Sequence, residues 1–148
     1  MSAPVTSMSP QQLIDAAKAP TLAFNRKDWD AVRAGVVPSG FVYDEVGTGR
    51  KAEGVDQALS IWQAWAAAFP DANATFERAV ANDDTVVLEV TWQGTHKGAL
   101  QTPSGSIPAT QNRFSARACL VLEMSGDKVR VERHYFDLVT LLHQLGVR

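Results

Sequence analysis

The chain has 148 residues, of which 14 are Lys or Arg and 16 are Asp or Glu, so its net charge is −2 with neutral histidines. This length is typical of one domain with a single substantial core, and we expect one domain over residues 1–148 with residues 1–8 flexible. The balanced charge lacks the basic surface that holds a phosphate backbone, which argues against nucleic acid as a partner.

Cys119 is the only cysteine, so neither an internal disulfide nor a thiolate zinc site is expected. The N-terminal segment has neither a basic nor an apolar signal region, and no apolar run approaches the ~18 residues of a membrane span. We therefore expect a cytoplasmic protein with no membrane contact.

Helical signals dominate the first half of the chain. A capping-box pattern at residues 9–12 predicts a helix to about residue 25, with a kink near Pro20. Asp28 is placed to cap a short second helix. A third helix is predicted over residues 55–69, where apolar side chains recur at spacings of three and four: Val55, Ala58, Leu59, Trp62, Trp65 and Phe69.

Two-residue alternation replaces the helical period after Asp71 and predicts consecutive antiparallel strands. With a short strand at residues 40–46, the expected strands are 74–81, 85–96, 107–124 and 128–136, with a loop over 98–106. The strand over 107–124 is unusually long and should bend or bulge, which lets a sheet enclose a cavity. A last helix is expected over 138–145. The fold class is α+β, with helices closing a strongly curved, mainly antiparallel sheet around an apolar cavity.

Alternation also assigns polar side chains to the cavity. It places His96 on the apolar row of its strand, and Arg133 and Asp137 on the row of the last strand that also holds Val129, Val131 and Tyr135. An unpaired ion is costly to bury, so these groups need partners, water or a ligand. An aromatic lining for a flat substrate is expected from Trp62, Trp65, Phe69, Trp92 and Tyr135, although core packing explains the same pattern.

Each polar candidate has two interpretations. Asp137 is placed to cap the last helix, or to abstract a proton α to a carbonyl, and the helix N-terminus favours the ionised form that weakens it as a base. His96 can polarise a carbonyl or simply be hydrogen-bonded, and Arg133 can orient an oxygen or pair with a carboxylate. The histidines lack metal-ligand spacing, and nucleophile-elbow, phosphate-loop and dinucleotide motifs are absent, so no metal is expected.

Four segments carry a family resemblance: AFNRKDWDAV, AFPDANATFE, WQGTHKG and RHYFDLVTLLHQLG. In their order and spacing, over about residues 10–147, the chain resembles the SnoaL-like branch of the nuclear-transport-factor-like superfamily, which includes polyketide and ester cyclases. The resemblance implies a cone-shaped barrel, a homodimer formed through the sheet, a hydrophobic ligand and no cofactor. It also implies that Asp137 matches the general acid/base of intramolecular aldol cyclisation and that His96 lines the same cavity.

The leading hypothesis is a cyclase or isomerase acting on a small hydrophobic carbonyl compound. Asp137 would remove an α-proton, His96 or Arg133 would stabilise the enolate, and Tyr43 would join the aromatic side chains in binding the substrate. Arg133 stands where the family often has tryptophan, which makes the expected pocket more polar. The alternatives are water addition to an epoxide, positioned by Arg133, Asp137 and Tyr43, and a carrier or sensor that only binds an apolar metabolite.

Overall fold

The computed structural model describes residues 8–147, so the flexibility expected of residues 1–8 falls almost wholly outside it. The helices are α1 (Pro10–Asn25), α2 (Trp29–Ala34), α3 (Val55–Ala68) and α4 (Leu138–Gln144). The strands are β1 (Val42–Glu45), β2 (Arg50–Glu53), β3 (Asn73–Asn82), β4 (Thr85–Thr95), β5 (Leu100–Thr102), β6 (Gly105–Ile107), β7 (Arg113–Ser125) and β8 (Lys128–Phe136).

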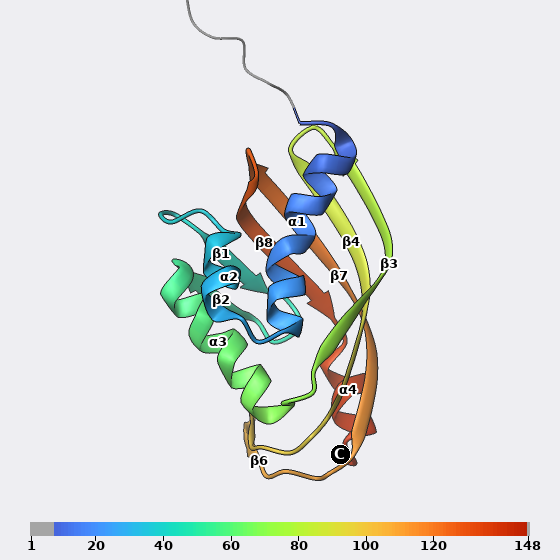
Figure 1. The fold of residues 1–148 in the computed structure, drawn as a ribbon. Helices are drawn as coiled ribbons and strands as arrows, with labels where there is room; N and C mark the ends of the chain where they lie inside the picture. The colour runs from blue at the N-terminus through green and yellow to red at the C-terminus, as the bar shows by residue number, and fades with distance from the viewer. Residues whose placement is uncertain (1–7, 148) are drawn as a thin grey trace, which may run out of the picture.

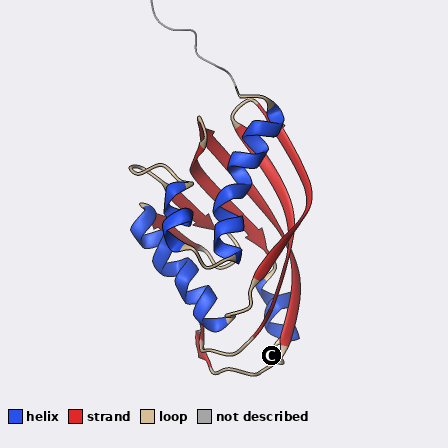
Figure 2. Ribbon diagram, viewed as in Figure 1, coloured by secondary structure: helices blue, strands red, loops and turns tan. Residues whose placement is uncertain are grey.

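A six-stranded sheet in the order β2-β1-β8-β7-β4-β3 forms the frame of the molecule. All neighbouring strands are antiparallel except β1 and β8, which pair in parallel. The sheet curves, and helices α1, α2 and α3 lie across its concave side (Figures 1 and 2). The predicted α+β class is confirmed. None of the helices within residues 8–147 is both long and apolar enough to cross a membrane.

The helix caps follow from the sequence. The Ser9 side chain accepts from the backbone N–H of Gln12, whose own side chain accepts from the N–H of Ser9, so the first turn of α1 is closed on both sides. Asp28 caps α2 through the N–H of Ala31. Helix α1 continues through Pro20, which packs against Gly35, where an added Cβ would lie 2.7 Å from the proline ring.

Strand boundaries differ from expectation in the region of residues 98–112. Residues 100–107, expected to divide between a loop and the start of a long strand, form the small hairpin β5–β6. Its turn lies at Pro103 and Ser104, and Gly105 begins β6 with φ of 123°. Strand β7 therefore begins at Arg113 rather than at residue 107. The short strand β2 was also missed, because its sequence, RKAE, buries only Ala52.

Two β-bulges interrupt the sheet. Glu77 is the extra residue of β3, between the positions opposite Val90 and Glu89. Arg130 is the extra residue of β8, where Val129 pairs with Met124 and Val131 with Glu123. A bulge bends its strand and shifts the alternation of side chains by one residue. The bulge at Arg130 therefore decides which side chains of β8 enter the interior.

Asn25 joins the end of α1 to the beginning of β3. Its side-chain amide donates to the carbonyl of Ala74 (3.0 Å) and its oxygen accepts from the N–H of the same residue (2.8 Å). Both backbone groups of Ala74 are thus satisfied by one side chain. This pair of bonds fixes the end of α1 against the edge strand of the sheet.

We expect Asn25→Ala to lower the free energy of unfolding by about 1–3 kcal/mol, because it leaves two partly buried backbone groups without partners. Urea denaturation monitored by tryptophan fluorescence measures this loss. Gln11→Ala is the matched control, since it removes an exposed hydrogen bond to Asp15 and should change stability by less than about 0.5 kcal/mol. Equal effects of the two substitutions would contradict the structural role of Asn25.

Candidate active site

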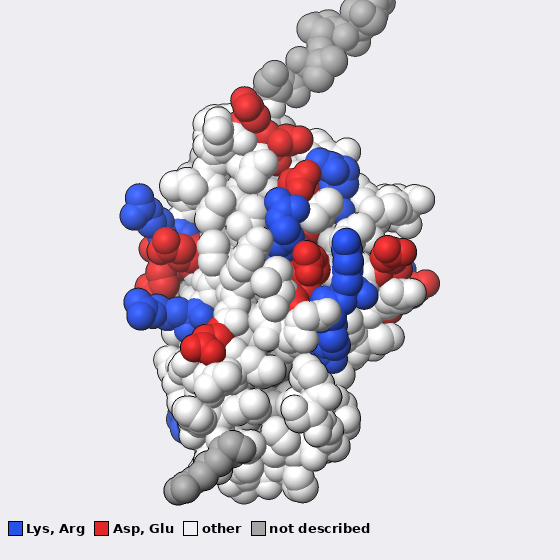
Figure 3. All heavy atoms as spheres, turned by 180° about the vertical axis from the view of Figure 1, so that it is seen from behind, with Lys and Arg blue, Asp and Glu red and all other residues white. Residues whose placement is uncertain are grey.

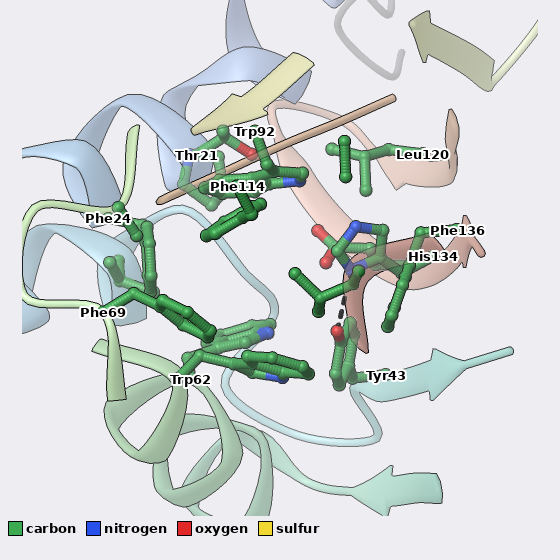
Figure 4. Close-up of a pocket in the computed structure, with 17 residues that line it drawn as sticks. Thr21, Phe24, Tyr43, Trp62, Phe69, Trp92, Phe114, Leu120, His134 and Phe136 are labelled. Carbon is green, nitrogen blue, oxygen red and sulfur yellow. Dashed lines mark hydrogen bonds between the residues drawn. The ribbon is translucent and has the colours of Figure 1, made fainter. Parts of the chain in front are cut away.

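A partly open, mostly aromatic cavity of about 90 Å³ lies between α1, α3 and the concave face of the sheet (Figure 4). Such a volume holds several water molecules or part of a small ligand. Five of the six side chains expected to bind substrate contribute to its wall. The lining residues are Pro20, Thr21, Phe24, Val32, Tyr43, Trp62, Trp65, Phe69, Ala72, Trp92, Phe114, Ala116, Leu120, Glu132, His134, Phe136 and Leu141.

Several pairs of rings in the wall meet edge to face. Phe24 meets Trp92 with 5.3 Å between ring centroids, and Tyr43 meets Trp62 at 5.2 Å. Phe69 meets Phe114 at 4.7 Å. Contacts of this geometry favour fixed ring positions, so the wall has a defined shape rather than a collapsed one.

Glu132 is the one acidic side chain among the lining residues. It is 7% exposed, and no hydrogen bond to its carboxyl group occurs within the described part of the chain. Burial, with a smaller contribution from the negative charge of Glu45, raises its pKa from 4.5 to about 8. At neutral pH the carboxyl group is therefore protonated, and it can donate a hydrogen bond.

His134 lies two residues further along β8, on the same side of the strand. Its Nδ1 forms a hydrogen bond of 2.9 Å with the Tyr43 hydroxyl, whereas its Nε2 is buried without a hydrogen-bond partner. Figure 4 marks the bond with a dashed line. Burial lowers the pKa of the imidazole from 6.5 to about 4, against the opposing influence of Glu45. The ring is therefore neutral at physiological pH.

The carboxylate of Glu45 lies behind Tyr43, with 0% exposure. Its Oε2 accepts from the Tyr43 hydroxyl and from the Trp65 indole N–H, both at 2.8 Å. Its Oε1 accepts from Thr48 and, through two bonds of 2.9 and 2.7 Å, from Arg50. Burial alone would raise the pKa of Glu45, but these hydrogen bonds and the charge of Arg50 outweigh it and lower the pKa.

Pairing between the first and last strands brings these groups together. In the parallel ladder Tyr43 stands opposite Glu132 and Glu45 opposite His134, so all four side chains point to the same side of the sheet. On the other flank of β8, Glu132 and His134 face Leu122 and Leu120, which are buried. The polar groups thus form one cluster on an otherwise apolar surface.

The expectation that Arg133, Tyr135 and Asp137 face the cavity was wrong. The predicted row began correctly at Val129, which is fully buried, but the bulge at Arg130 shifts the alternation, and the residues that enter are Glu132, His134 and Phe136. Tyr135 is 41% exposed on the outer face of the sheet. It is therefore the one expected binding residue absent from the cavity wall.

Arg133 belongs to a charged cluster on the outer face. It pairs with Glu123 at 2.7 Å, and Arg130 pairs with the other oxygen of the same carboxylate at 2.7 Å. Acidic and basic side chains are interspersed across this side of the molecule (Figure 3). Arg133 thus pairs with a carboxylate, which was one of its two interpretations, and the partner is Glu123.

Asp137 is exposed and caps α4. Its Oδ1 accepts from the N–H groups of Val139 and Thr140, and its Oδ2 accepts from the Thr140 hydroxyl. Hydrogen bonds from Thr140 lower the pKa of Asp137. An ionised carboxylate that is saturated by its own helix is a poor general base, so the geometry favours capping.

His96 is fully buried, as strand alternation predicted, but it is not part of the cavity wall. It lies behind Phe69, with 5.3 Å between ring centroids. Its Nδ1 accepts from the N–H of Thr110 at 3.2 Å, and burial lowers its pKa. The bond at Nδ1 fits the hydrogen-bonded core histidine that was the alternative interpretation. Its Nε2, like that of His134, is buried without a partner, but His96 lies outside the cavity wall.

Sequence reasoning missed Glu132, His134 and Glu45. The first two were assigned to the outer face by unbroken alternation, and Glu45 was overlooked in a short strand. One signal was available, because Glu132, His134 and Phe136 form a row as mixed in polarity as the row that was chosen. Within residues 8–147, no three His, Cys, Asp or Glu side chains cluster closely enough to hold a metal ion.

Comparisons with known proteins agree with this architecture. Residues 14–145 match the family model of the SnoaL-like polyketide cyclases. Among solved structures, wild-type IdmH from Streptomyces antibioticus is similar at 26% identity, with a TM-score of 0.77 and coverage of 92% of this chain and 99% of that one. No curated protein matches the sequence.

Two further structures share the fold at lower identity. A protein from Jannaschia sp. CCS1, assigned as a SnoaL-like polyketide cyclase, is 16% identical, with a TM-score of 0.82 and 99% coverage of both chains. An LEH-like epoxide hydrolase of M. tuberculosis is 20% identical, with a TM-score of 0.70 and coverage of 92% of this chain and 90% of that one.

The opposite pKa shifts of Glu132 and His134 predict a pH profile of stability. Glu132 has a raised pKa, so its contribution is complete below pH 4.5 and is lost as the pH rises to about 8. His134 has a lowered pKa, so its contribution is complete above pH 6.5 and is lost as the pH falls to about 4. Between pH 4.5 and 6.5 the two groups change the free energy of unfolding in opposite directions as the pH rises. Above pH 6.5 only the contribution of Glu132 still changes.

We therefore expect the free energy of unfolding to decline between pH 6.5 and 8 by up to about 1.4 kcal/mol per pH unit. In Glu132→Gln this decline should disappear, and a loss of stability below pH 6.5 should become visible. Urea denaturation at half-unit pH steps, analysed as the difference between wild type and variant, separates this site from other titrating groups. Parallel profiles for the two proteins would refute the assigned protonation of Glu132.

Proposed function

Because the chain belongs to the SnoaL-like polyketide cyclase family, we propose that it is a cofactor-independent enzyme that performs acid/base chemistry on a small hydrophobic carbonyl compound. The cavity would bind the substrate, His134 would remove a proton α to the carbonyl, and Glu132 would hydrogen-bond the resulting enolate oxygen. The reaction class is intramolecular aldol cyclisation or isomerisation.

The observation that carries this proposal is a pair of cavity side chains with complementary protonation. The neutral imidazole of His134 leaves Nε2 buried without a partner, and the neutral carboxyl of Glu132 lies beside it along the strand. One group can accept a proton and the other can donate a hydrogen bond at the same pH. Titratable pairs whose surroundings separate their pKa values in this way are typical of acid/base sites.

Proton transfer follows from these roles. The C–H bond α to the carbonyl breaks, its proton moves to Nε2 of His134, and the electron pair forms the enolate. The Glu132 carboxyl donates to the enolate oxygen, and the indole N–H of Trp92, also buried without a partner, is a second donor in the wall. In an aldol cyclisation the enolate carbon then attacks a second carbonyl, and the imidazolium protonates the resulting alkoxide. In an isomerisation the imidazolium returns the proton to another carbon.

The alternative of water addition to an epoxide has less support. It required Arg133 and Asp137 to position the water together with Tyr43, and the first two side chains lie outside the cavity. Binding without catalysis remains the competing function, and the assay below separates it from catalysis. The homodimer and the cytoplasmic location stay predictions.

Hydrogen–deuterium exchange of 2-tetralone tests the proposal, because this bicyclic ketone has acidic protons next to its carbonyl. We expect the protein to accelerate exchange above the buffer rate, as measured by proton NMR. His134→Gln should lower the enzymatic rate about 10²- to 10⁴-fold. Glu132→Ala should lower it about 10²- to 10³-fold, and Glu132→Gln by less, because an amide still donates.

Asp137→Asn serves as the control, since asparagine also caps a helix and the carboxylate lies outside the cavity. It should exchange the ketone at the wild-type rate. Tryptophan quenching by 2-tetralone without accelerated exchange would favour a binding protein. A large loss in Asp137→Asn with full activity in His134→Gln would overturn the assignment of the base.

A further inference from the structure

We propose that Glu45 is a positioning residue that fixes the tautomer of His134 through the hydroxyl of Tyr43, so that Nε2 carries the lone pair and Nδ1 carries the proton. The inference deepens the proposed function, because it explains why Nε2, the ring nitrogen without a hydrogen-bond partner, is the basic one. It rests on a chain of two hydrogen bonds from β1 to β8. The tautomer follows from which of the three groups can donate a hydrogen bond and which can only accept one.

The ionised state of Glu45 sets the donor and acceptor of each hydrogen bond between Glu45, Tyr43 and His134. A carboxylate only accepts hydrogen bonds, and the hydrogen bonds and charge around Glu45 lower its pKa, so it is ionised. The Tyr43 hydroxyl lies 2.8 Å from Oε2 and has one proton, which it donates to this charged acceptor. A charge-assisted bond of this kind is stronger than a bond to a neutral imidazole.

The donor of the second hydrogen bond, between Tyr43 and His134, then follows. With its proton committed to Glu45, the Tyr43 oxygen can only accept from His134, whose Nδ1 is 2.9 Å away. Nδ1 therefore carries the N–H, and in a neutral ring Nε2 must be the unprotonated nitrogen. This nitrogen is buried and has no hydrogen-bond partner. If His134 takes a proton from a substrate, both ring nitrogens become donors and the same chain places the imidazolium two hydrogen bonds from an anion.

Other groups around the ring do not compete for Nδ1. Trp92 and Phe136 approach His134 with centroid distances of 6.1 and 4.9 Å, and neither is bonded to it. Tyr43 resists ionisation, because burial and the charges of Glu45 and Glu132 raise its pKa well above 10. Tyr43 therefore stays protonated, and its hydroxyl connects Glu45 to Nδ1 of His134 without acting as a base.

Glu45→Gln should exchange donor and acceptor in both hydrogen bonds that link residue 45, Tyr43 and His134. The cationic Arg50 offers only donors to the Oε1 side, so the glutamine oxygen takes that side. Its NH₂ group then faces Tyr43 and leaves the Trp65 N–H without its acceptor. The Tyr43 oxygen then accepts from the amide and its proton turns to Nδ1 of His134. We expect His134 to change from the Nδ1–H to the Nε2–H tautomer. Tyr43→Phe removes the relay while leaving Thr48, Arg50 and Trp65 on Glu45, and should give a mixture of tautomers.

Long-range ¹H–¹⁵N NMR of the imidazole rings reads the tautomers directly. His96 provides an internal control in each spectrum, because its Nδ1 accepts from the backbone of Thr110 and it should remain Nε2–H in every variant. An unchanged His96 pattern also shows that the variant has folded. Wild-type His134 should show a protonated Nδ1 and an unprotonated Nε2, opposite to His96.

Two outcomes would overturn the proposal: an Nε2–H tautomer of His134 in the wild type, or an unchanged Nδ1–H tautomer in both Glu45→Gln and Tyr43→Phe. If the tautomer changes as expected and 2-tetralone exchange falls in kcat with little change in KM, positioning and catalysis are both supported. If the tautomer changes but no variant affects exchange, the proposed function fails while the positioning role of Glu45 stands.

Discussion

The buried carboxylate of Glu45 is the constraint on which the rest of the site depends. An ion removed from water costs several kcal/mol unless it is paired and fully hydrogen-bonded. Its five hydrogen bonds come from Tyr43 in its own strand, Thr48 and Arg50 in the adjoining hairpin, and Trp65 in α3. The turn between β1 and β2 and the rotation of α3 are therefore tied to one charge. Moving either element would leave that charge unsatisfied.

The same charge influences the protonation of its neighbours. A second carboxylate in a shared apolar space is disfavoured by burial and by repulsion from the first, which keeps Glu132 neutral. His134 loses its charge to burial, and the attraction of Glu45 only moderates this effect. Among residues 8–147 the interior thus contains one anion, Glu45, which is balanced at its edge by Arg50, whose side chain is 32% exposed. Catalysis by His134 would add a cation to this arrangement, at the far end of the hydrogen-bond chain from Glu45.

The fold could be predicted further than the site. Helical spacing, caps and two-residue alternation gave the elements and the curved sheet, and alternation along β4 correctly buried His96. The same rule failed on β8, because one extra residue at Arg130 exchanges the two faces for every position after it. Hydrophobicity did not reveal the error, since each row of β8 contains both apolar and ionisable positions. The bulge depends on pairing with β7, which local sequence does not specify.

A polar row on a concave sheet face contradicts the rule that strands bury their apolar side, and this contradiction is itself informative. Glu132 and His134 are costly where they stand, and neither is needed to close the core, because Leu120 and Leu122 cover the adjacent strand. Natural sequences tolerate such local conflicts chiefly where function requires them. Asp137 and Arg133 show the opposite pattern, since each satisfies its charge through ordinary surface partners. The distinction between the two pairs is therefore physical: the groups suited to chemistry are those that the fold leaves incompletely satisfied.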